Sequence, residues 1–518
     1  MASPSPSPEA AAAAAAAPPA VIAPATPPRK SSSALGRVLS ELGLASLWRS
    51  TADVKLLCAQ RLVRMLGYGA STLVLVAYLD ALGHRKTEIG LFMTLTLAGD
   101  IGVSFALTLF ADALGRRAVL ALGALLMAAS GLAFAFFRSY WVLLLAAVVG
   151  VISPNGNEIG PFRAIEESIV AQLTVPENRS DIYAWYSLSG LAGAAFGLMI
   201  CGWILQFLTG VLHWDLLSAY RAIYLLYAAI GLVKLCLTLF LSHSVEAEKE
   251  QQQQRRRSPE SSSETAPLLD GGRPREGAQE IAPMPTEPRQ RTGLRRLIPD
   301  ISRESAFVVT ILCFLFGLDA FGTGVNPLSW ITYYFQWRFD IEKGELGSIF
   351  FVTQIIAAIS MLVASSIAKR LGNVKTMVLT HLPSQVFRAL IGVPGNVHMA
   401  LLFLVLNAST ASMDTAPRSA FLATIIPAGE RTAVMGTLNV VKTATASLGP
   451  IITGVLVDRD LYWVSFVLGG SLKGLYDVGI LVFFRQRERE RERSERDRIR
   501  RQQEEEEGDG GLTRDGPA

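Results

Sequence analysis

The chain has 518 residues, of which 50% are hydrophobic, and its mean hydropathy is +0.35. Long apolar runs recur from about residue 56 to residue 484, which excludes an ordinary soluble protein because a soluble core has no room for so many of them. The formal net charge of +4 lies mostly in loops and tails, so it gives no reason to expect a nucleic acid partner.

Polar regions frame the apolar part of the chain. The first residues, 1–34, are mainly Pro, Ala and Ser without the basic and Leu-rich regions of a signal peptide, so we expect a disordered tail and lead-in over 1–55. Residues 243–303 are too polar to pack and predict a disordered cytoplasmic linker. The tail 485–518 alternates Arg and Glu, which is typical of an exposed charged helix, with a docking surface as the alternative.

Twelve apolar segments lie between these regions, each near the ~20 residues that a helix needs to cross ~30 Å of hydrocarbon. The first six are predicted at 58–82, 88–110, 117–137, 140–172, 182–209 and 220–242, and the second six at 304–326, 345–368, 374–393, 397–425, 433–457 and 462–484. The pattern predicts an all-α membrane protein with twelve transmembrane helices in two pseudo-symmetric bundles, 56–242 and 304–484.

An internal repeat relates the two bundles. Arg179, Gly197 and Gly202 have the same spacings, 18 and then 5, as Arg431, Gly449 and Gly454. A membrane chain that repeats its own pattern is most often a transporter built from two similar halves.

Cations indicate the orientation in the membrane. Arg116, Arg117, Arg179, Arg431 and the basic tail fall on one side, so we expect both termini in the cytoplasm. The sequon at Asn178 then faces the cytosol and stays unmodified. The four cysteines have no paired spacing, and we expect no disulfide framework, metal or cofactor.

The loop between the second and third segments reads Phe110-Ala-Asp112-Ala-Leu-Gly115-Arg116-Arg117. A short turn with Gly at the bend and cations at the membrane surface suits two antiparallel helices that slide during a conformational change. The loop resembles that of the major facilitator superfamily, whose signature is Gly-x-Leu-Ala-Asp-Arg-x-Gly-Arg-Lys. Thr108, Phe110 and Ala113 depart from it.

The resemblance covers residues 56–484 and implies a twelve-span transporter that works by alternating access. It also implies that Asp112 bonds to other helix ends and stabilises the outward-facing state. For Arg116 and Arg117 the alternative is that they only anchor the helix at the lipid headgroups.

The fourth segment carries the densest polar stretch of any predicted span. Two prolines and two glycines between Pro154 and Pro161 cannot sustain a regular helix, and a broken helix is tolerated in a membrane only beside water or protein. The break is expected to expose carbonyls beside Asn155, Asn157 and Glu158, which makes these three residues candidates for binding a polar solute and a proton.

Other polar residues lie deep in the segments, where an ionisable group costs at least ~2.5–3.5 kcal/mol. These candidates for the solute or proton are Asp100, Asp319, Arg388, Asp414, Lys442, Arg64 and Tyr68. Lys442 lies 11 residues after Arg431, about 16 Å along a helix, and its repeat mate is Gly190. A structural Lys–Asp pair is the alternative for Lys442, and snorkelling to the surface is the alternative for Arg64 and its neighbour Arg61.

Arg163 and Arg418 lie in similar places near the cytoplasmic ends of segments four and ten. With Arg179 and Arg431 they are the candidate cytoplasmic-end charges. The alternative is anchoring at the membrane surface or, for Arg163, pairing with Glu166 or Glu167.

The leading hypothesis is a secondary active transporter, not an enzyme, that moves a small polar or amphipathic solute coupled to protons and works as a monomer in the lipid bilayer. The alternatives are a transporter-like nutrient sensor and a membrane-embedded enzyme or lipid-transfer protein, which scattered histidines disfavour. We expect the plasma membrane, with a vacuolar or endosomal membrane as the alternative because Leu268-Leu269 follow an acidic residue in the linker.

Overall fold

A computed structural model describes residues 44–150, 152–154, 161–175, 178–246, 303–427 and 430–485. The predicted N-terminal tail, linker and C-terminal tail lie largely outside these residues, so their boundaries stay predictions. Asn155, Asn157, Glu158 and the side chain of Asp112 also lie outside the described part.

Helices of the first half match the six predicted segments within a few residues, with segment four divided into α7 and α8. They are α3 (Leu44–Arg49), α4 (Ala52–Ala81), α5 (Lys86–Leu114), α6 (Arg116–Phe136), α7 (Tyr140–Val149), α8 (Pro161–Leu173), α9 (Arg179–Gln206), the π-turn η2 (Phe207–Val211), α10 (Leu216–Leu239) and the short η3 (His243–Val245). The carbonyls of Ser153 and Pro154, beyond the end of α7, accept hydrogen bonds from the hydroxyl of Thr72 and the backbone N–H of Ser329. Both carbonyls thus accept from groups outside their own helix, as the predicted helix break requires.

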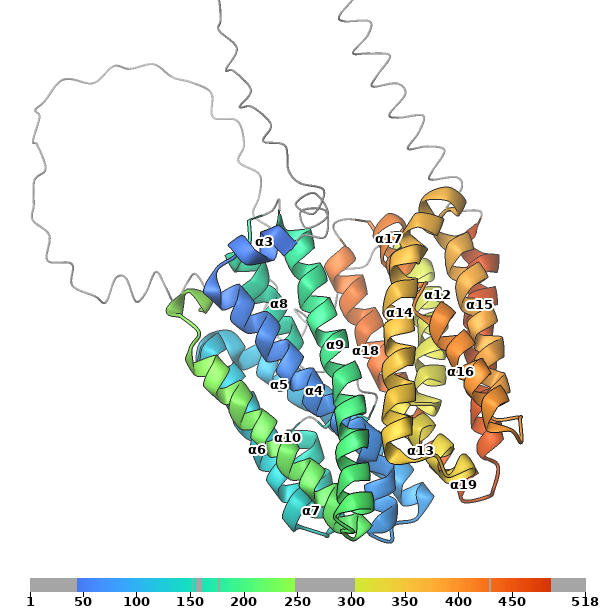
Figure 1. Cartoon of the computed structure of the whole chain (residues 1–518). Helices are drawn as coiled ribbons and strands as arrows, with labels where there is room; N and C mark the ends of the chain where they lie inside the picture. The colour runs from blue at the N-terminus through green and yellow to red at the C-terminus, as the bar shows by residue number, and fades with distance from the viewer. Residues whose placement is uncertain are drawn as a thin grey trace, which may run out of the picture.

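The second half repeats the arrangement. Its helices are α12 (Arg303–Val325), α13 (Leu328–Phe339), α14 (Lys343–Leu371), α15 (Asn373–Leu390), α16 (Val397–Ala411), α17 (Thr415–Ile425), α18 (Arg431–Ser447), α19 (Gly449–Val457) and a last helix, Tyr462–Arg485. The two halves stand side by side, and they meet where α9 packs on α14 and where α5 packs on α18 and α19 (Figure 1). The predicted all-α fold is confirmed.

Two segments of the second half differ from their predicted form. Segment seven does not end at 326, because α13 continues it to Phe339 after the bend at Pro327, which caps α13. Segment ten is broken at Ser412–Asp414, between α16 and α17. Pro417 explains this break, since it has no N–H for an intrahelical bond and its ring opposes a helical turn before it.

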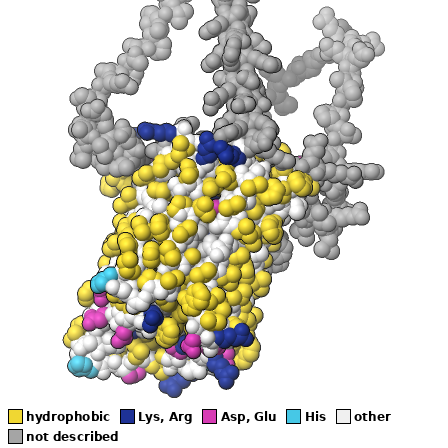
Figure 2. Space-filling view, turned by 90° about the vertical axis from the view of Figure 1, so that its right-hand side faces the viewer, with side chains coloured by type: hydrophobic (Ala, Val, Ile, Leu, Met, Phe, Trp, Pro, Cys, Tyr) yellow, Lys and Arg dark blue, Asp and Glu magenta, His cyan; other side chains and the backbone are white. Residues whose placement is uncertain are grey.

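The outer surface is suited to lipid. Eight helices of the described part are long and apolar enough to cross a membrane, and the shorter apolar helices α7 and α16 belong to broken segments. Side chains in the middle of the face shown in Figure 2 are mostly hydrophobic, whereas charged ones gather toward its two ends. This distribution is that of an integral, multi-pass membrane protein.

The repeat glycines bring the halves together. A Cβ atom on Gly202 of α9 would lie 3.1 Å from the Cα atom of Gly347 in α14, and one on its mate Gly454 would lie 3.1 Å from the Cα atom of Gly90 in α5. Each crossing is therefore close enough to require glycine on both helices. The repeat found in the sequence thus forms two equivalent contacts between the halves.

Hydrogen bonds join the halves at one end, which we call the α7 end and which comprises residues 82–86, 137–140, 212–216, 339–343 and 458–462. Tyr333 donates to Asp80 over 2.7 Å, Trp203 donates to Ser348 over 3.0 Å, and the backbone N–H of Gly344 donates to Gln206 over 3.0 Å. The opposite end carries α3, α8 and α17 (Figure 1), and we call it the α3 end. The halves are thus tied together at the α7 end.

Candidate functional site

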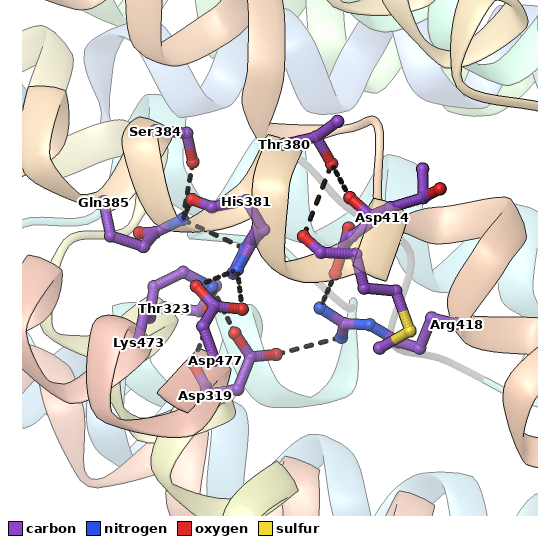
Figure 3. A network of polar contacts seen from close by, with 12 residues as sticks. Asp319, Thr323, Thr380, His381, Ser384, Gln385, Asp414, Arg418, Lys473 and Asp477 are labelled. Carbon is purple, nitrogen blue, oxygen red and sulfur yellow. Dashed lines mark hydrogen bonds and ion pairs between the residues drawn. The ribbon is translucent and has the colours of Figure 1, made fainter. Parts of the chain in front are cut away.

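A cluster of charges is buried in the second half, and we call it the Asp319 network: Asp319, Asp414, Arg418 and Lys473. Asp319 of α12 is 3% exposed and accepts from the Nζ atom of Lys473 over 2.6 Å and from Arg418 over 3.0 Å. Arg418 also bonds to Asp414, and Lys473 donates to Thr323 over 2.9 Å. One carboxylate is thus shared by cations from two other helices, as Figure 3 shows.

Local structure places Arg418 in this network. Asp414 is the residue before α17, and Arg418 follows one turn later, so the break in segment ten turns both side chains to the same face. The rings of Phe316 and Tyr476 lie 5.4 Å and 5.3 Å from the guanidinium carbon. Aromatic faces stabilise a desolvated cation, so Arg418 is held by two carboxylates and two rings.

Lys442 of α18 extends toward the same cluster. Its Nζ atom lies 5.7 Å from the centre of the Phe316 ring, which Arg418 also contacts. Among the described residues, no carboxylate lies within ion-pair distance of Lys442. The predicted alternative of a structural Lys–Asp pair is therefore wrong within the described part, and the second half holds a half-exposed cation beside its buried network.

The first half has its own buried ion pair. Arg64 of α4 donates to both oxygens of Glu166 in α8, over 2.5 Å and 2.8 Å, and Tyr186 of α9 donates to the same carboxylate over 2.6 Å. Glu166 is 0% and Arg64 1% exposed. Snorkelling is therefore wrong for Arg64. Arg61 stacks on the ring of Tyr186 at 4.0 Å.

The repeat relates the two clusters. Glu166 lies 13 residues before Arg179, and Arg418 lies 13 residues before Arg431, so an acid in one half occupies the position of a base in the other. Gly190, the repeat mate of Lys442, contacts the guanidinium group of Arg61. A cation therefore occupies this place in both halves, but from different helices.

A second pair lies beside the Asp319 network. The Nδ1 atom of His381 in α15 is 2.9 Å from both oxygens of Asp477 in the last helix. The Nε2 atom of His381 is 3.0 Å from the amide nitrogen of Gln385. Both members of the pair are buried.

The structure brings together part of the predicted set. Asp319, Asp414, Arg418 and Lys442 meet, so anchoring at the surface is wrong for Arg418. Arg388 lies in the last turn of α15, and its Nε atom is buried without a partner among the described residues. Tyr68 is buried in the first half, and Asp100 is buried with Ser104 at 3.4 Å.

Of the other candidate cytoplasmic-end charges, Arg163 lies at the edge of the first-half cluster, since its partner Glu167 is also 3.9 Å from Arg61. Arg163 is exposed and pairs with Glu167 over 2.7 Å, one of its two predicted partners. Arg179 donates to the carbonyls of Ala171 and Thr174, and Arg431 donates to that of Ala423. Each of these last two arginines ties its helix to the one before it.

The predicted gating loop is a sharp turn. Gly115 has φ 88° and its counterpart Gly372 has φ 84°, a conformation that favours glycine, so the expectation of Gly at the bend is confirmed. Glu246 accepts from the backbone N–H groups of Arg116 and Arg117 over 2.7 Å and 3.2 Å. A carboxylate after α10 thus caps α6, a role that the sequence did not indicate.

Several functional candidates were missed in the sequence. Lys473 and Asp477 lie four residues apart in an apolar segment, and the rule that singled out Asp319 also applies to them. His381 is one of the scattered histidines to which the sequence assigns no role, and Glu166 is predicted only as a partner of Arg163. Lys234 is likewise a charged residue in an apolar segment, and it is buried with its Nζ atom 5.1 Å from the Phe162 ring.

At the α7 end, Asp458 binds the start of α5. Its carboxylate accepts from the backbone N–H groups of Lys86 and Thr87 over 3.1 Å and 2.8 Å, and from the Thr87 hydroxyl over 2.5 Å. Burial alone raises the pKa of Asp458, but the hydrogen bonds from Thr87 and Lys86 outweigh it and leave that pKa below its ordinary value. Asp458 therefore stays charged and holds the two halves together.

Comparisons with known proteins agree with this architecture. A family model described as Major Facilitator Superfamily matches residues 57–383 and 309–504. An uncharacterized membrane protein of Saccharomyces cerevisiae is 37% identical over 429 residues, which cover 82% of this chain and 92% of that protein.

Two solved structures share the fold. The nucleoside transporter NupG has a TM-score of 0.59 at 13% identity, covering 84% of this chain and 99% of NupG. A D-xylose–proton symporter has a TM-score of 0.60 at 14% identity, covering 83% and 97%.

Proposed function

The chain belongs to the Major Facilitator Superfamily, and from this membership we propose that it is a secondary active transporter that moves a small polar or amphipathic solute by alternating access, coupled to protons. The observation that carries the proposal is the sharing of Asp319 between Lys473 and Arg418 inside an apolar bundle. A static anchor needs only one partner for each charge. A shared carboxylate can exchange partners when a solute or a proton arrives.

Lys442 supports a solute with a negatively charged group. It is a half-exposed ammonium beside the Asp319 network with no carboxylate at ion-pair distance among the described residues. An uncompensated cation in a membrane protein is costly unless water or a bound anion stabilises it. We assign Lys442 the role of contacting the anionic end of the solute.

Alternating access is supported by the contacts between the halves. The hydrogen bonds of Tyr333, Gln206 and Asp458 close the α7 end. They are few and lie at the edge of the interface, so a rocking motion about the glycine crossings can break them while each half stays intact.

We propose that both termini are cytoplasmic, that the protein works as a monomer and that it resides in the plasma membrane, with a vacuolar or endosomal membrane as the alternative. Arg116, Arg179 and Arg431 lie at the α3 end, which then faces the cytosol. Expression in a glycosylating cell tests the orientation: a glycan on Asn178 contradicts it, whereas modification of a sequon inserted after Asp458 supports it.

Counterflow tests the function. Proteoliposomes loaded with an unlabelled water-soluble cell extract are placed in the same extract labelled with ¹³C, with and without a pH gradient, and internal compounds are identified by mass spectrometry. We expect one or a few labelled anionic compounds to enter faster than into empty liposomes, and to accumulate further with the gradient. Entry of none contradicts the proposal.

A further inference from the structure

We propose that His381 and Asp477 form the proton-binding site of this transporter, separate from the place where the solute binds. This inference rests on the proposed function, which requires a proton but does not say where it binds. Among the described residues, neither His381 nor Asp477 is hydrogen-bonded to a member of the Asp319 network.

Hydrogen bonding assigns the tautomer of His381 in the described structure. A carboxylate can only accept, so the Nδ1 atom of His381, which lies 2.9 Å from both oxygens of Asp477, carries a hydrogen. The Nε2 atom of His381 lies 3.0 Å from the amide nitrogen of Gln385, which offers no acceptor, so Nε2 carries none. The same amide nitrogen also donates to the Oγ atom of Ser384 over 2.6 Å and to the carbonyl of His381 over 3.3 Å. The pair is therefore a neutral imidazole that donates to a carboxylate.

Gln385 can serve a second protonation state. Its Oε1 atom is buried without a hydrogen-bond partner among the described residues, and the residue is 1% exposed. Rotation of the amide by about 180° places Oε1 where Nε2 lies now. The oxygen then accepts from a protonated Nε2 of His381 and from the Ser384 hydroxyl, and the hydrogen bond from the amide to the His381 carbonyl is given up. One side chain thus offers a donor to neutral histidine and an acceptor to charged histidine.

Charges around the pair connect it to the Asp319 network. Asp477 and Lys473 are four residues apart on the last helix and share a face, on which Lys473 reaches Asp319 (Figure 3). The ionisable groups that act on the pair are Asp319 on α12 and Lys473 and Tyr476 on the last helix. Arg418 and Asp414 lie beyond Asp319, and Arg388 acts on Lys473. A proton on His381 offsets the charge of Asp477 and weakens its attraction for Lys473, which Asp319 then holds more strongly.

Burial makes the site suitable for coupling. His381 is 2% and Asp477 1% exposed, so a proton bound in this state cannot exchange freely with water. Coupling requires this occlusion, because a proton that leaks through would not drive the solute. The alternative is a purely structural hydrogen bond that joins α15 to the last helix. In that case the protonation of His381 and Asp477 would not change during transport.

Nuclear magnetic resonance with ¹⁵N-labelled histidine tests proton binding directly. The full chain in nanodiscs has five histidines, and the signal lost in His381→Gln belongs to His381. We expect an Nδ1-protonated neutral ring at alkaline pH that gains a second proton on acidification. Gln385→Met removes the acceptor for this proton, so the doubly protonated ring should appear at a lower pH than in the wild type. A ring that stays neutral throughout, or an Nε2-protonated tautomer, overturns the inference.

Transport separates this inference from the proposed function. In the labelled-extract assay, His381→Gln and Asp477→Asn should keep exchange within about threefold of the wild type and lose accumulation driven by a pH gradient. The matched control is the exposed His398→Gln, which should keep both. If the wild type exchanges nothing, the proposed function fails while the resonance experiment still decides proton binding. If exchange occurs and His381→Gln keeps driven accumulation, the proton site is wrong.

Discussion

The two halves of the molecule hold buried charge in different ways. In the first half, Arg64 and Glu166 form a bidentate pair that Tyr186 completes at the carboxylate. In the second half, Asp319 is divided between Lys473 and Arg418, and Arg418 is divided between Asp319 and Asp414. A bidentate pair has one favourable arrangement, whereas a shared carboxylate has several of similar energy. We infer that the first half is built as an anchor and the second half as the part that responds to solute and proton.

The difference arises on a repeated framework. Glu166 and Arg418 occupy equivalent repeat positions with opposite charge, and the place of Gly190, filled by Arg61, corresponds to Lys442. Duplicated halves thus keep the location of buried charge while they change its sign and its partners. Substitutions in the buried cluster of the first half should therefore lower stability, whereas those in the second half should lower transport.

The largest effect is expected for the anchor. Glu166→Gln removes the carboxylate to which both terminal nitrogens of the buried Arg64 donate, and breaking a buried pair in this way costs about 3–5 kcal/mol of stability. Thermal unfolding in nanodiscs should show a lower midpoint, while exchange per folded molecule stays within about threefold of the wild type. Glu167→Gln is the matched control, because the Glu167 side chain is 32% exposed and its pairs with Arg163 over 2.7 Å and Arg61 over 3.9 Å are each worth at most about 1 kcal/mol. Equal losses in both variants would remove the basis for calling the first pair an anchor.

For the shared carboxylate we expect a loss of transport rather than of folding. Asp319→Asn keeps the shape and some hydrogen bonds, and Asp414 still holds Arg418, but the charge that Lys473 and Arg418 share is gone. Labelled-extract exchange should fall about 100-fold, equivalent to about 2.7 kcal/mol. Asp340→Asn at the exposed end of α13 should change nothing. Normal exchange in folded Asp319→Asn would reverse the comparison between the halves.

A smaller effect is expected for Lys442, which has no ion-pair partner among the described residues. Lys442→Met removes the proposed contact with the anionic group of the solute, so exchange at low concentrations of labelled extract should fall about tenfold and recover at high concentrations. Lys375→Met, on α15 near the α3 end, is the control and should behave like the wild type. A variant that loses exchange equally at every concentration would point to a structural role for Lys442.

The smallest effect concerns the α7 end. Asp458→Asn weakens the carboxylate contact with the start of α5 and should favour opening of that end by about 0.5–2 kcal/mol, measured with spin labels on both sides. Because the pKa of Asp458 is below its ordinary value of 3.8, the contact is complete above that pH and is lost only as the pH falls through the lowered pKa. Closure should therefore be constant between about pH 5 and pH 8. A loss of closure on mild acidification would assign the contact to another group.

Local features could be predicted from the sequence better than pairings could. Segment length gave the helices, Gly115 marked the bend, and prolines marked the break after α7, because each depends on neighbours in the chain. The continuation after Pro327 was missed because a proline that ends one helix can also begin the next.

The site itself was only partly predictable. Asp319, Asp414, Arg418 and Lys442 could be selected because charge in an apolar segment is unusual. Their partners depend on how α12, α17 and the last helix face one another, which segment order does not determine. Lys473 is also a charge in an apolar segment, but only the fold shows that its Nζ atom lies 2.6 Å from Asp319.

The central claim is that the two halves separate at the α7 end during transport, and a reversible cross-link tests it most directly. Thr87 and Asp458 contact each other across the halves, so Thr87→Cys and Asp458→Cys can be joined by a short bifunctional thiol reagent in a chain without its native cysteines. Without the reagent the double variant should exchange labelled extract. Joined, it should exchange none, and a reducing agent should restore the rate. Exchange at full rate while the two residues are joined would contradict the account.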